Sequence, residues 1–265
     1  MEVHQHTHTE SPPAGRAGKK WTHYLWEFLM LFLAVFCGFL AENIREHRVE
    51  NSRAKEYAKS LINELYEDTV QLKLIEREGP FAASCIDTLR DIYLTGKTDS
   101  AYYSKLYWYA DFTIDGLEFI QHDATLRQLL SSGNLRYFHD VDLVNDIEKY
   151  NWLTGSLKDI HERDRITNNE AKSLHGKIFD MNIMTKVRAL LYGTNDSLIF
   201  SETDKQQFLK SKPKLLTEDK VLLNQYIEWG ETRKRRLASM GSLAQKALAA
   251  NKIIITALKS VYGLK

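Results

Sequence analysis

The most hydrophobic stretch of the chain, WEFLMLFLAVFCGFLAEN, occupies residues 26–43. No polar side chain interrupts residues 28–41, and Trp21, Tyr24 and Trp26 extend the run on its N-terminal side. A bilayer core about 30 Å thick needs roughly 20 mostly apolar helical residues to cross it, and aromatic rings favour the membrane interface. The pattern therefore predicts a transmembrane anchor at residues 21–41, with the lipid bilayer as its partner.

Two alternatives compete with an uncleaved anchor. A cleaved signal peptide would need small residues before its cleavage point, and Phe39, Leu40 and Ala41 do not supply the A-x-A pattern. A buried core helix is the other alternative. Lys19 and Lys20 adjoin the span, which favours a cytoplasmic N-terminus, although further basic residues follow at 45–59.

The rest of the chain has the periodicity of long helices. Apolar residues recur in steps of three and four from residue 57 onward, most regularly over 141–178 and in the last 45 or so residues. The whole chain contains only 13 Gly and 4 Pro, a shortage of turn formers that favours long helices over many short strands.

Local signals predict where these segments begin and end. Residues 1–20 read as a disordered tail, and the domain at 42–265 opens with a polar juxtamembrane stalk at 42–56. Gly79-Pro80 is expected to stop the first helix of that domain. Asp123 and Thr217 are expected to be N-caps of later helices.

The last helix should exceed roughly 60 Å in length, and an amphipathic face of that size cannot bury itself. Its expected partners are the stalk helix and the helix at 141–178, and Arg233 and Asn251 fall on its apolar seam. We therefore expect an all-α fold, with an N-terminal transmembrane helix followed by an elongated helical bundle with long stalk-like helices.

Charge and cysteine content exclude some partners. A formal net charge of +1 gives no concentrated basic surface, so nucleic acid is not an expected partner. Cys37 lies inside the apolar run, so Cys37 and Cys85 do not make a disulfide framework. Cys85 is expected to be a small buried hydrophobe.

No catalytic or cofactor motif is present. A Gly-rich phosphate loop, HExxH, CxxC and G-x-S-x-G are all missing, which predicts no enzyme activity, no cofactor and no metal site. The acidic and histidine groups HDVD (139–142) and HERD (161–164) would diverge on a helix, so we interpret them as caps and solvated charges.

Aromatic residues gather at 102–112, in the segment YYSKLYWYADF. Aromatic rings with polar tips can line a ligand pocket or form a binding hot spot, and they also fill bundle cores. Tyr103, Tyr107 and Trp108 are therefore candidates for a ligand or partner surface, with core packing as the competing interpretation.

Two stretches carry a resemblance to a known family. HYLWEFLMLFLAVFCGFLAEN (23–43) with the charged stalk after it resembles the anchor of a family of uncharacterised bacterial single-span membrane proteins, and ATLRQLLSSGNLRYFHDVDLVNDIEKY (124–150) is similar to their internal segment. The resemblance implies an N-terminal anchor and an all-helical body. We expect a location in the bacterial inner (cytoplasmic) membrane, with the N-terminus in the cytoplasm and the helical domain in the periplasm.

On the anchor helix, Glu27, Ala34, Gly38 and Ala41 share one stripe. Ala34 and Gly38 form a small-xxx-small pair that lets two helices approach closely in lipid, and Glu27 could bond across such a pair or simply reach water. We expect a membrane-anchored scaffold or protein-interaction module, partnered by a second copy or another membrane protein. The alternative is a sensor-like domain outside the cytoplasm that binds a small ligand near the aromatic cluster.

Overall fold

The computed structural model describes residues 17–114, 116–192 and 199–264, and its described elements are helical throughout. The prediction of an all-α fold is thus confirmed. The elements are listed in chain order: α1 (Ala17–Thr95), α2 (Tyr102–Ala110), the 3₁₀ helix η1 (Asp111–Thr113), α3 (Ala124–Ser131), the 3₁₀ helix η2 (Asn134–Tyr137), α4 (Val141–Ile178), α5 (Met181–Tyr192), α6 (Glu202–Leu209) and α7 (Lys220–Tyr262). The chain divides into two structural units, residues 1–54 and 55–265.

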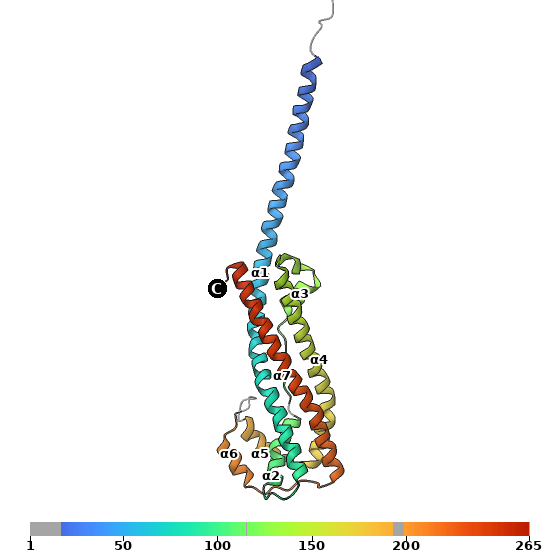
Figure 1. The fold of residues 1–265 in the computed structure, drawn as a ribbon, viewed down its shortest axis with the longest axis vertical. Helices are drawn as coiled ribbons and strands as arrows, with labels where there is room; N and C mark the ends of the chain where they lie inside the picture. The colour runs from blue at the N-terminus through green and yellow to red at the C-terminus, as the bar shows by residue number, and fades with distance from the viewer. Residues whose placement is uncertain (1–16, 115, 193–198, 265) are drawn as a thin grey trace, which may run out of the picture. The chain divides into compact units, whose positions relative to one another are not determined.

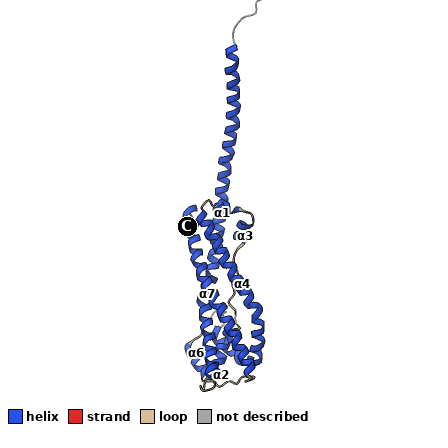
Figure 2. Ribbon diagram, turned by 45° about the vertical axis from the view of Figure 1, so that its right-hand side comes forward, coloured by secondary structure: helices blue, strands red, loops and turns tan. Residues whose placement is uncertain are grey.

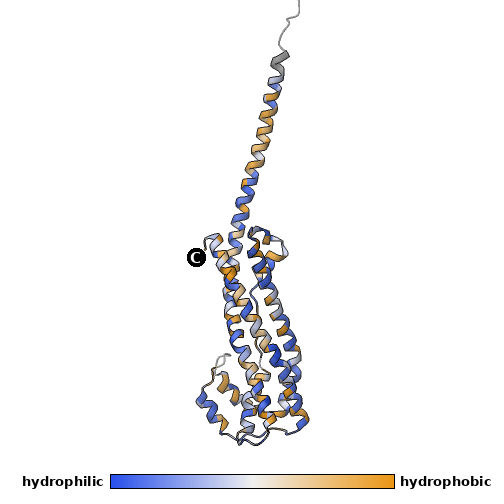
Figure 3. Ribbon diagram, in the orientation of Figure 1, coloured by the Kyte–Doolittle hydropathy of each residue, from blue (hydrophilic) through white to orange (hydrophobic). Residues whose placement is uncertain are grey.

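The first unit contains the apolar segment, coloured orange on the early part of α1 in Figure 3. Trp26, Leu31 and Phe39 expose 65%, 68% and 70% of their surface, and none of the most apolar window is buried within the structure. By length and composition, this part of α1 could cross a membrane. The predicted tail at 1–20 lies largely outside the described residues, and α1 already begins at Ala17.

Three long helices build the second unit: α1 from Lys55 onward, α4 and α7 (Figures 1 and 2). Along α1, Leu65 bonds Asn251 of α7 and Asp87 bonds Lys234, so these helices are antiparallel. Along α4, Asp164 meets Arg233 and His175 meets Tyr226, so α4 is antiparallel to α7 as well. The last helix therefore packs on both of its expected partners.

The prediction that Gly79-Pro80 stops the first helix is wrong, because α1 continues through Pro80 to Thr95. The two residues lie where α1 crosses α7. A Cβ atom on Gly79 would stand 2.8 Å from the Leu237 carbonyl oxygen, and one on Gly241 would stand 2.8 Å from Pro80 Cδ. Glycine is thus needed on both helices for their backbones to come this close. Packing at this crossing offsets the cost of proline inside a helix, which is about 3 kcal/mol.

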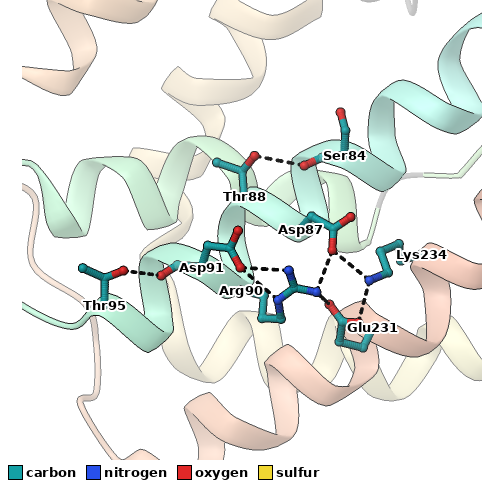
Figure 4. Close-up of polar contacts among 8 residues, drawn as sticks. All are labelled: Ser84, Asp87, Thr88, Arg90, Asp91, Thr95, Glu231 and Lys234. Atoms are coloured by element: carbon teal, nitrogen blue, oxygen red, sulfur yellow. Dashed lines mark hydrogen bonds and ion pairs between the residues drawn. The ribbon is translucent and has the colours of Figure 1, made fainter.

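Beyond the crossing, a polar network joins α1 to α7 (Figure 4). Lys234 Nζ lies 2.8 Å from Asp87 Oδ1 and 2.8 Å from Glu231 Oε2, and Arg90 Nη1 lies 3.2 Å from Glu231 Oε1. The Lys234 ammonium lowers the pKa of Asp87. Because these side chains are partly exposed, the network contributes little stability and mainly fixes the register of the two helices.

Helix α4 has the bounds that periodicity predicts. Asp140 is its N-cap, with the carboxylate accepting bonds from the backbone N–H groups of Asp142 (3.0 Å) and Leu143 (3.2 Å), as expected for one member of HDVD. Of the other two predicted caps, the one at Thr217 is wrong, because Asp219 caps α7 instead. Asp123 does stand at the N-cap position of α3, as predicted, but Glu64 of α1 accepts the bonds from the N–H groups of Thr125 and Leu126 in place of the Asp123 side chain.

Because α1 and α4 both run antiparallel to α7, they are parallel to each other, and residues 96–140 return the chain between them. Part of this return, 116–123, is non-helical and runs alongside α1. The Gln71 amide bonds both backbone polar groups of Ile120 (2.8 and 2.9 Å), and the buried carboxylate of Asp68 accepts bonds from His122 N–H (2.8 Å) and Tyr150 OH (2.7 Å). Helical side chains thus supply the hydrogen bonds that a neighbouring strand would otherwise give.

Helices α2 and α5 pack at the end of the bundle where α7 begins, around one apolar cluster that includes Ile86, Leu106, Met184 and Val187. Cys85 is buried in the same cluster, as predicted, and burial raises the pKa of its thiol to about 12. This end of the bundle carries the candidate site.

Candidate functional site

A cleft of about 830 Å³ opens between η1, the segment after it, α4 and α5. The side chains around it come from four parts of the chain that the fold brings together: Asp111, Ile114, Gly116, Glu118, Lys172, His175, Gly176, Met181, Arg188, Ala189 and Tyr192. A volume of this size lies in the range of small-molecule sites.

His175 is the most buried polar group of the cleft lining after Asp111, with 2% of its surface exposed. Its ring packs on Phe179 and Tyr226, at centroid distances of 4.9 and 5.9 Å, and its Nε2 atom has no hydrogen-bond partner. Burial, with a smaller contribution from the Arg188 charge, lowers the pKa of His175 to about 4. The imidazole is therefore neutral at pH 7.

Asp111 and Arg188 form an ion pair in the same wall. Arg188 Nε donates to Asp111 Oδ1 at 2.7 Å, and the carboxylate side chain is 1% exposed while that of Arg188 is 40% exposed. The ion pair thus joins a buried carboxylate to a partly exposed guanidinium. Because the carboxylate is buried, its bond to Arg188 helps to offset the cost of removing this charge from water.

Glycine keeps the cleft open on the α4 side. A Cβ atom built on Gly176 would meet nothing within 4 Å, so neither close packing nor unusual backbone geometry demands glycine there. Glycine inside a helix costs about 1 kcal/mol relative to alanine. At Gly176 the missing side chain leaves open space in the α4 wall of the cleft.

The arrangement offers binding chemistry: a neutral imidazole, a guanidinium, an ammonium group on Lys172 and a carboxylate on Glu118. Within residues 17–114, 116–192 and 199–264, no three His, Cys, Asp or Glu side chains gather as a metal site would require.

The candidate aromatic residues lie elsewhere. Tyr107 and Trp108 are 0% and 1% exposed. Tyr107 packs on Phe179 and its hydroxyl donates to the Lys214 carbonyl (2.9 Å) and accepts from Asp180 N–H (2.9 Å), while Trp108 packs on Phe200 and Phe208. Tyr103, half-buried, bonds Glu218. This packing favours the core interpretation of the cluster over a ligand surface.

The anchor stripe is exposed in the structure. Glu27, Ala34, Gly38 and Ala41 are all exposed, and a Cβ atom on Gly38 would meet nothing within 4 Å. Glu27 Oε1 lies 3.0 Å from His23 Nε2, one turn earlier. No part of the chain that the structure describes covers the stripe, and its role in helix pairing stays a prediction.

The interpretation of HERD as solvated charge is wrong for Asp164. This carboxylate is buried and meets Arg233 Nε at 3.2 Å and Arg236 Nη1 at 3.5 Å. Arg233 also donates to the Phe112 carbonyl (3.3 Å), which places the seam position predicted for α7 inside the core. Asp164 and Arg233 therefore hold α4, α7 and η1 together.

Sequence reasoning missed Asp111, His175 and Arg188. The one available signal was the spacing of His175, four residues after Ala171 and three before Ile178, which puts a titratable ring on the buried stripe of α4.

Comparison with known proteins gives no further assignment: no family model matches the chain, and neither a curated protein nor a solved structure does. The resemblance of its anchor and middle segment to single-span bacterial proteins thus stays a prediction.

Proposed function

We propose that this protein is a membrane-anchored helical module that acts by binding and not by catalysis. The observation that supports it is the apolar segment at 21–41, whose large side chains are exposed in the folded chain and lose that exposure only in lipid or against another helix. The anchor lies in a bacterial inner membrane, with the N-terminus in the cytoplasm and the helical domain in the periplasm.

Protease treatment of intact spheroplasts tests this topology. We expect the domain at 42–265 to be digested from outside, while an epitope tag on residue 1 is protected. Protection of the whole chain until the cells are lysed would refute the orientation.

The anchor also pairs with a second copy or with another membrane protein. Support comes from the stripe of Ala34, Gly38 and Ala41, since small side chains let helix backbones approach closely in lipid. Glu27 heads the same stripe and forms an interhelical hydrogen bond, replacing its contact with His23.

Crosslinking in native membranes tests the pairing. Gly38→Leu and Ala34→Leu should reduce the dimer band, and Glu27→Leu should weaken it while insertion is unchanged. Phe36→Leu is the matched control, because nine residues from Glu27 at 3.6 residues per turn place it on the opposite side of the helix. A dimer band that all variants share, or that none shows, would refute pairing through this stripe.

A second candidate function is a small-ligand-binding domain, and the cleft at His175 favours it. The cleft of about 830 Å³ is lined by His175 and by both members of the Asp111–Arg188 ion pair, and its size and mixed lining are typical of a small-molecule site. The aromatic cluster, where such a ligand was first expected, is packed.

Native mass spectrometry of the chain purified from its own membranes tests this function. We expect a bound small mass in the wild type that is lost in Gly176→Leu, which fills the cleft without a backbone clash. An identical spectrum for both proteins would count against the ligand site.

A further inference from the structure

A groove of about 420 Å³ lies between α4 and α7 and shares no lining residue with the cleft at His175. Three arginines line it, together with two hydroxyl side chains and one apolar residue: Ile160, Arg163, Thr232, Arg235, Arg236 and Ser239. Arg163 and Arg235 are exposed, and 24% of the Arg236 side chain is exposed, so all three are open to solvent at least in part. Among the residues that the structure describes, no carboxylate lines the groove.

These three arginines have donors to spare. Arg163 uses only its Nε atom, which donates to the Asp159 carbonyl (3.1 Å). Arg236 uses only Nη1, which donates to the Thr167 hydroxyl. The Arg235 side chain bonds no residue in the described part of the chain. Two guanidinium groups are therefore held in place through one nitrogen each, and their other N–H groups are available to a ligand.

The acidic residues around the groove leave its charge largely uncompensated. Five lie within four positions of a lining residue in the sequence, and the structure describes all of them: Asp159, Glu162, Asp164, Glu228 and Glu231. Glu162 bonds Arg165 (2.7 Å), and Glu231 bonds Lys234 and Arg90 in the network of Figure 4. Asp159 and Glu228 are exposed and do not line the groove.

The fifth acid, Asp164, serves two arginines. Its buried carboxylate lies 3.2 Å from Arg233 Nε and 3.5 Å from Arg236 Nη1, so one negative charge faces two positive ones. Arg163 and Arg235 add two more guanidinium groups at the groove. A groove lined by charges of one sign concentrates ions of the opposite sign. The groove between α4 and α7 therefore attracts an anion.

The number of donors indicates which anion. A carboxylate offers two oxygens, which a single guanidinium binds bidentately, whereas a phosphomonoester offers three oxygens and a charge of about −1.5 to −2 at pH 7. Three guanidinium groups and the Thr232 hydroxyl around one space suit the larger number of acceptors.

We propose that the groove between α4 and α7 binds the phosphate group of a phosphomonoester, held by Arg163, Arg235 and Arg236. This goes beyond the functions proposed above, because it assigns a binding site separate from the anchor and from the cleft at His175.

Three probes that share a benzene ring test the chemical class: phenyl phosphate, benzoate and neutral benzyl alcohol. Each is titrated by calorimetry into the full chain in phosphatidylcholine nanodiscs at pH 8, where the phosphate is doubly charged, and empty nanodiscs give the blank. We expect phenyl phosphate to bind with a Kd about tenfold below that of benzoate, the ratio that one further charge-assisted hydrogen bond gives. Benzyl alcohol should not bind measurably in the groove.

Variants localise the binding. Arg163→Gln and Arg235→Gln should each weaken phenyl phosphate about fivefold, the upper range for a partly exposed ion pair. Arg235→Lys keeps the charge without the planar fork and should recover only part of the loss. Lys246→Gln is the matched control, because it removes one exposed positive charge of α7 that lies outside the groove. Its 11 residues from Arg235 span about 16 Å of helix, beyond the range of unscreened attraction, so the Kd should stay unchanged.

A second set of nanodiscs, containing phosphatidic acid, distinguishes a lipid phosphate from a soluble one. If a lipid headgroup occupies the groove, the Kd for phenyl phosphate rises in the wild type and not in Arg235→Gln. If the phosphate comes from a soluble molecule, the Kd is the same in both kinds of nanodisc. Either result supports a phosphate site and identifies its source.

Other outcomes would overturn the proposal. Benzoate binding as tightly as phenyl phosphate would refute the phosphate class. The same Kd in the wild type, Arg163→Gln and Arg235→Gln, or no binding of phenyl phosphate at all, would refute the site. A loss in Lys246→Gln as large as that in Arg235→Gln would show diffuse attraction to the basic surface in place of a groove, and would refute the site as well.

Discussion

The crossing of α1 and α7 allows a sharp prediction about stability. Replacing Gly79 by alanine puts a methyl group 2.8 Å from the Leu237 carbonyl oxygen, where ordinary contact begins at 3.4 Å. The helices must therefore separate by roughly 0.6 Å, the difference of these two distances. The obstructing atom belongs to the backbone, so a side-chain rotation cannot relieve the clash.

The magnitude follows from two opposing effects. Overpacking of this kind costs about 1–3 kcal/mol, and a backbone contact lies toward the upper end. Alanine in place of glycine in a helix returns about 1 kcal/mol. Gly79→Ala should thus destabilise the bundle by about 2 kcal/mol. Gly155→Ala is the control, because its Cβ would meet nothing within 4 Å and only the helix preference remains.

Thermal unfolding of the full chain, monitored by tryptophan fluorescence, measures the stability of both variants. At about 2–4 °C per kcal/mol for a domain of this size, Gly79→Ala should lower the Tm by about 4–8 °C. Gly155→Ala should raise it by about 2–4 °C on the same scale. Equal shifts of the same sign in the two variants would refute the close approach of the backbones at Gly79.

Three further predictions concern buried polar groups. Folding lowers the pKa of His175 from 6.5 to about 4, so as the pH falls the unfolded chain binds this proton before the folded chain does. The free energy of unfolding should therefore decrease by roughly 3 kcal/mol between pH 6.5 and pH 4. Chemical denaturation across that range should show a shallower pH dependence in His175→Gln; an unchanged slope would contradict the assignment. Asp164→Asn leaves the Arg233 charge buried without its carboxylate and should cost about 3–5 kcal/mol, seen as a lower denaturation midpoint, whereas a change below about 1 kcal/mol would mean that water reaches the pair. Cys85, whose thiol has its pKa raised to about 12, should resist maleimide at pH 8 until the chain unfolds, and rapid labelling in the folded state would show that this end of the bundle opens.

Periodicity predicted the long helices well because each of them buries one continuous stripe. The 141–178 pattern matched α4 at both ends, since Asp140 caps its start and Phe179 leaves the helical conformation. The prediction at Gly79-Pro80 was wrong because it considered only the tendency of proline to end a helix. In the structure, α7 packs so closely on α1 at this point that glycine is needed at position 79. Sequence signals for helix ends describe only nearby residues of the same segment, so they carry no information about the packing of α7 against α1.

The cleft was beyond prediction for a similar reason. Asp111 and Arg188 are 77 residues apart in the chain, and His175 lies on another helix; only packing brings them together. None of the three belongs to a motif. The same holds for the cap of α3, which Glu64 supplies from 61 residues away.

The bond between Asn251 and the Leu65 carbonyl joins positions 186 residues apart. At about 5–20 residues per second, a ribosome needs roughly 10–40 s to make the chain between them. During that time the face of α1 that α7 later covers has no native partner, although the segment at 96–140 and then α4 have already emerged. Chaperones and proteases of the cell therefore meet an incomplete bundle in every round of translation, and the rate at which α7 docks sets how long it is exposed to them.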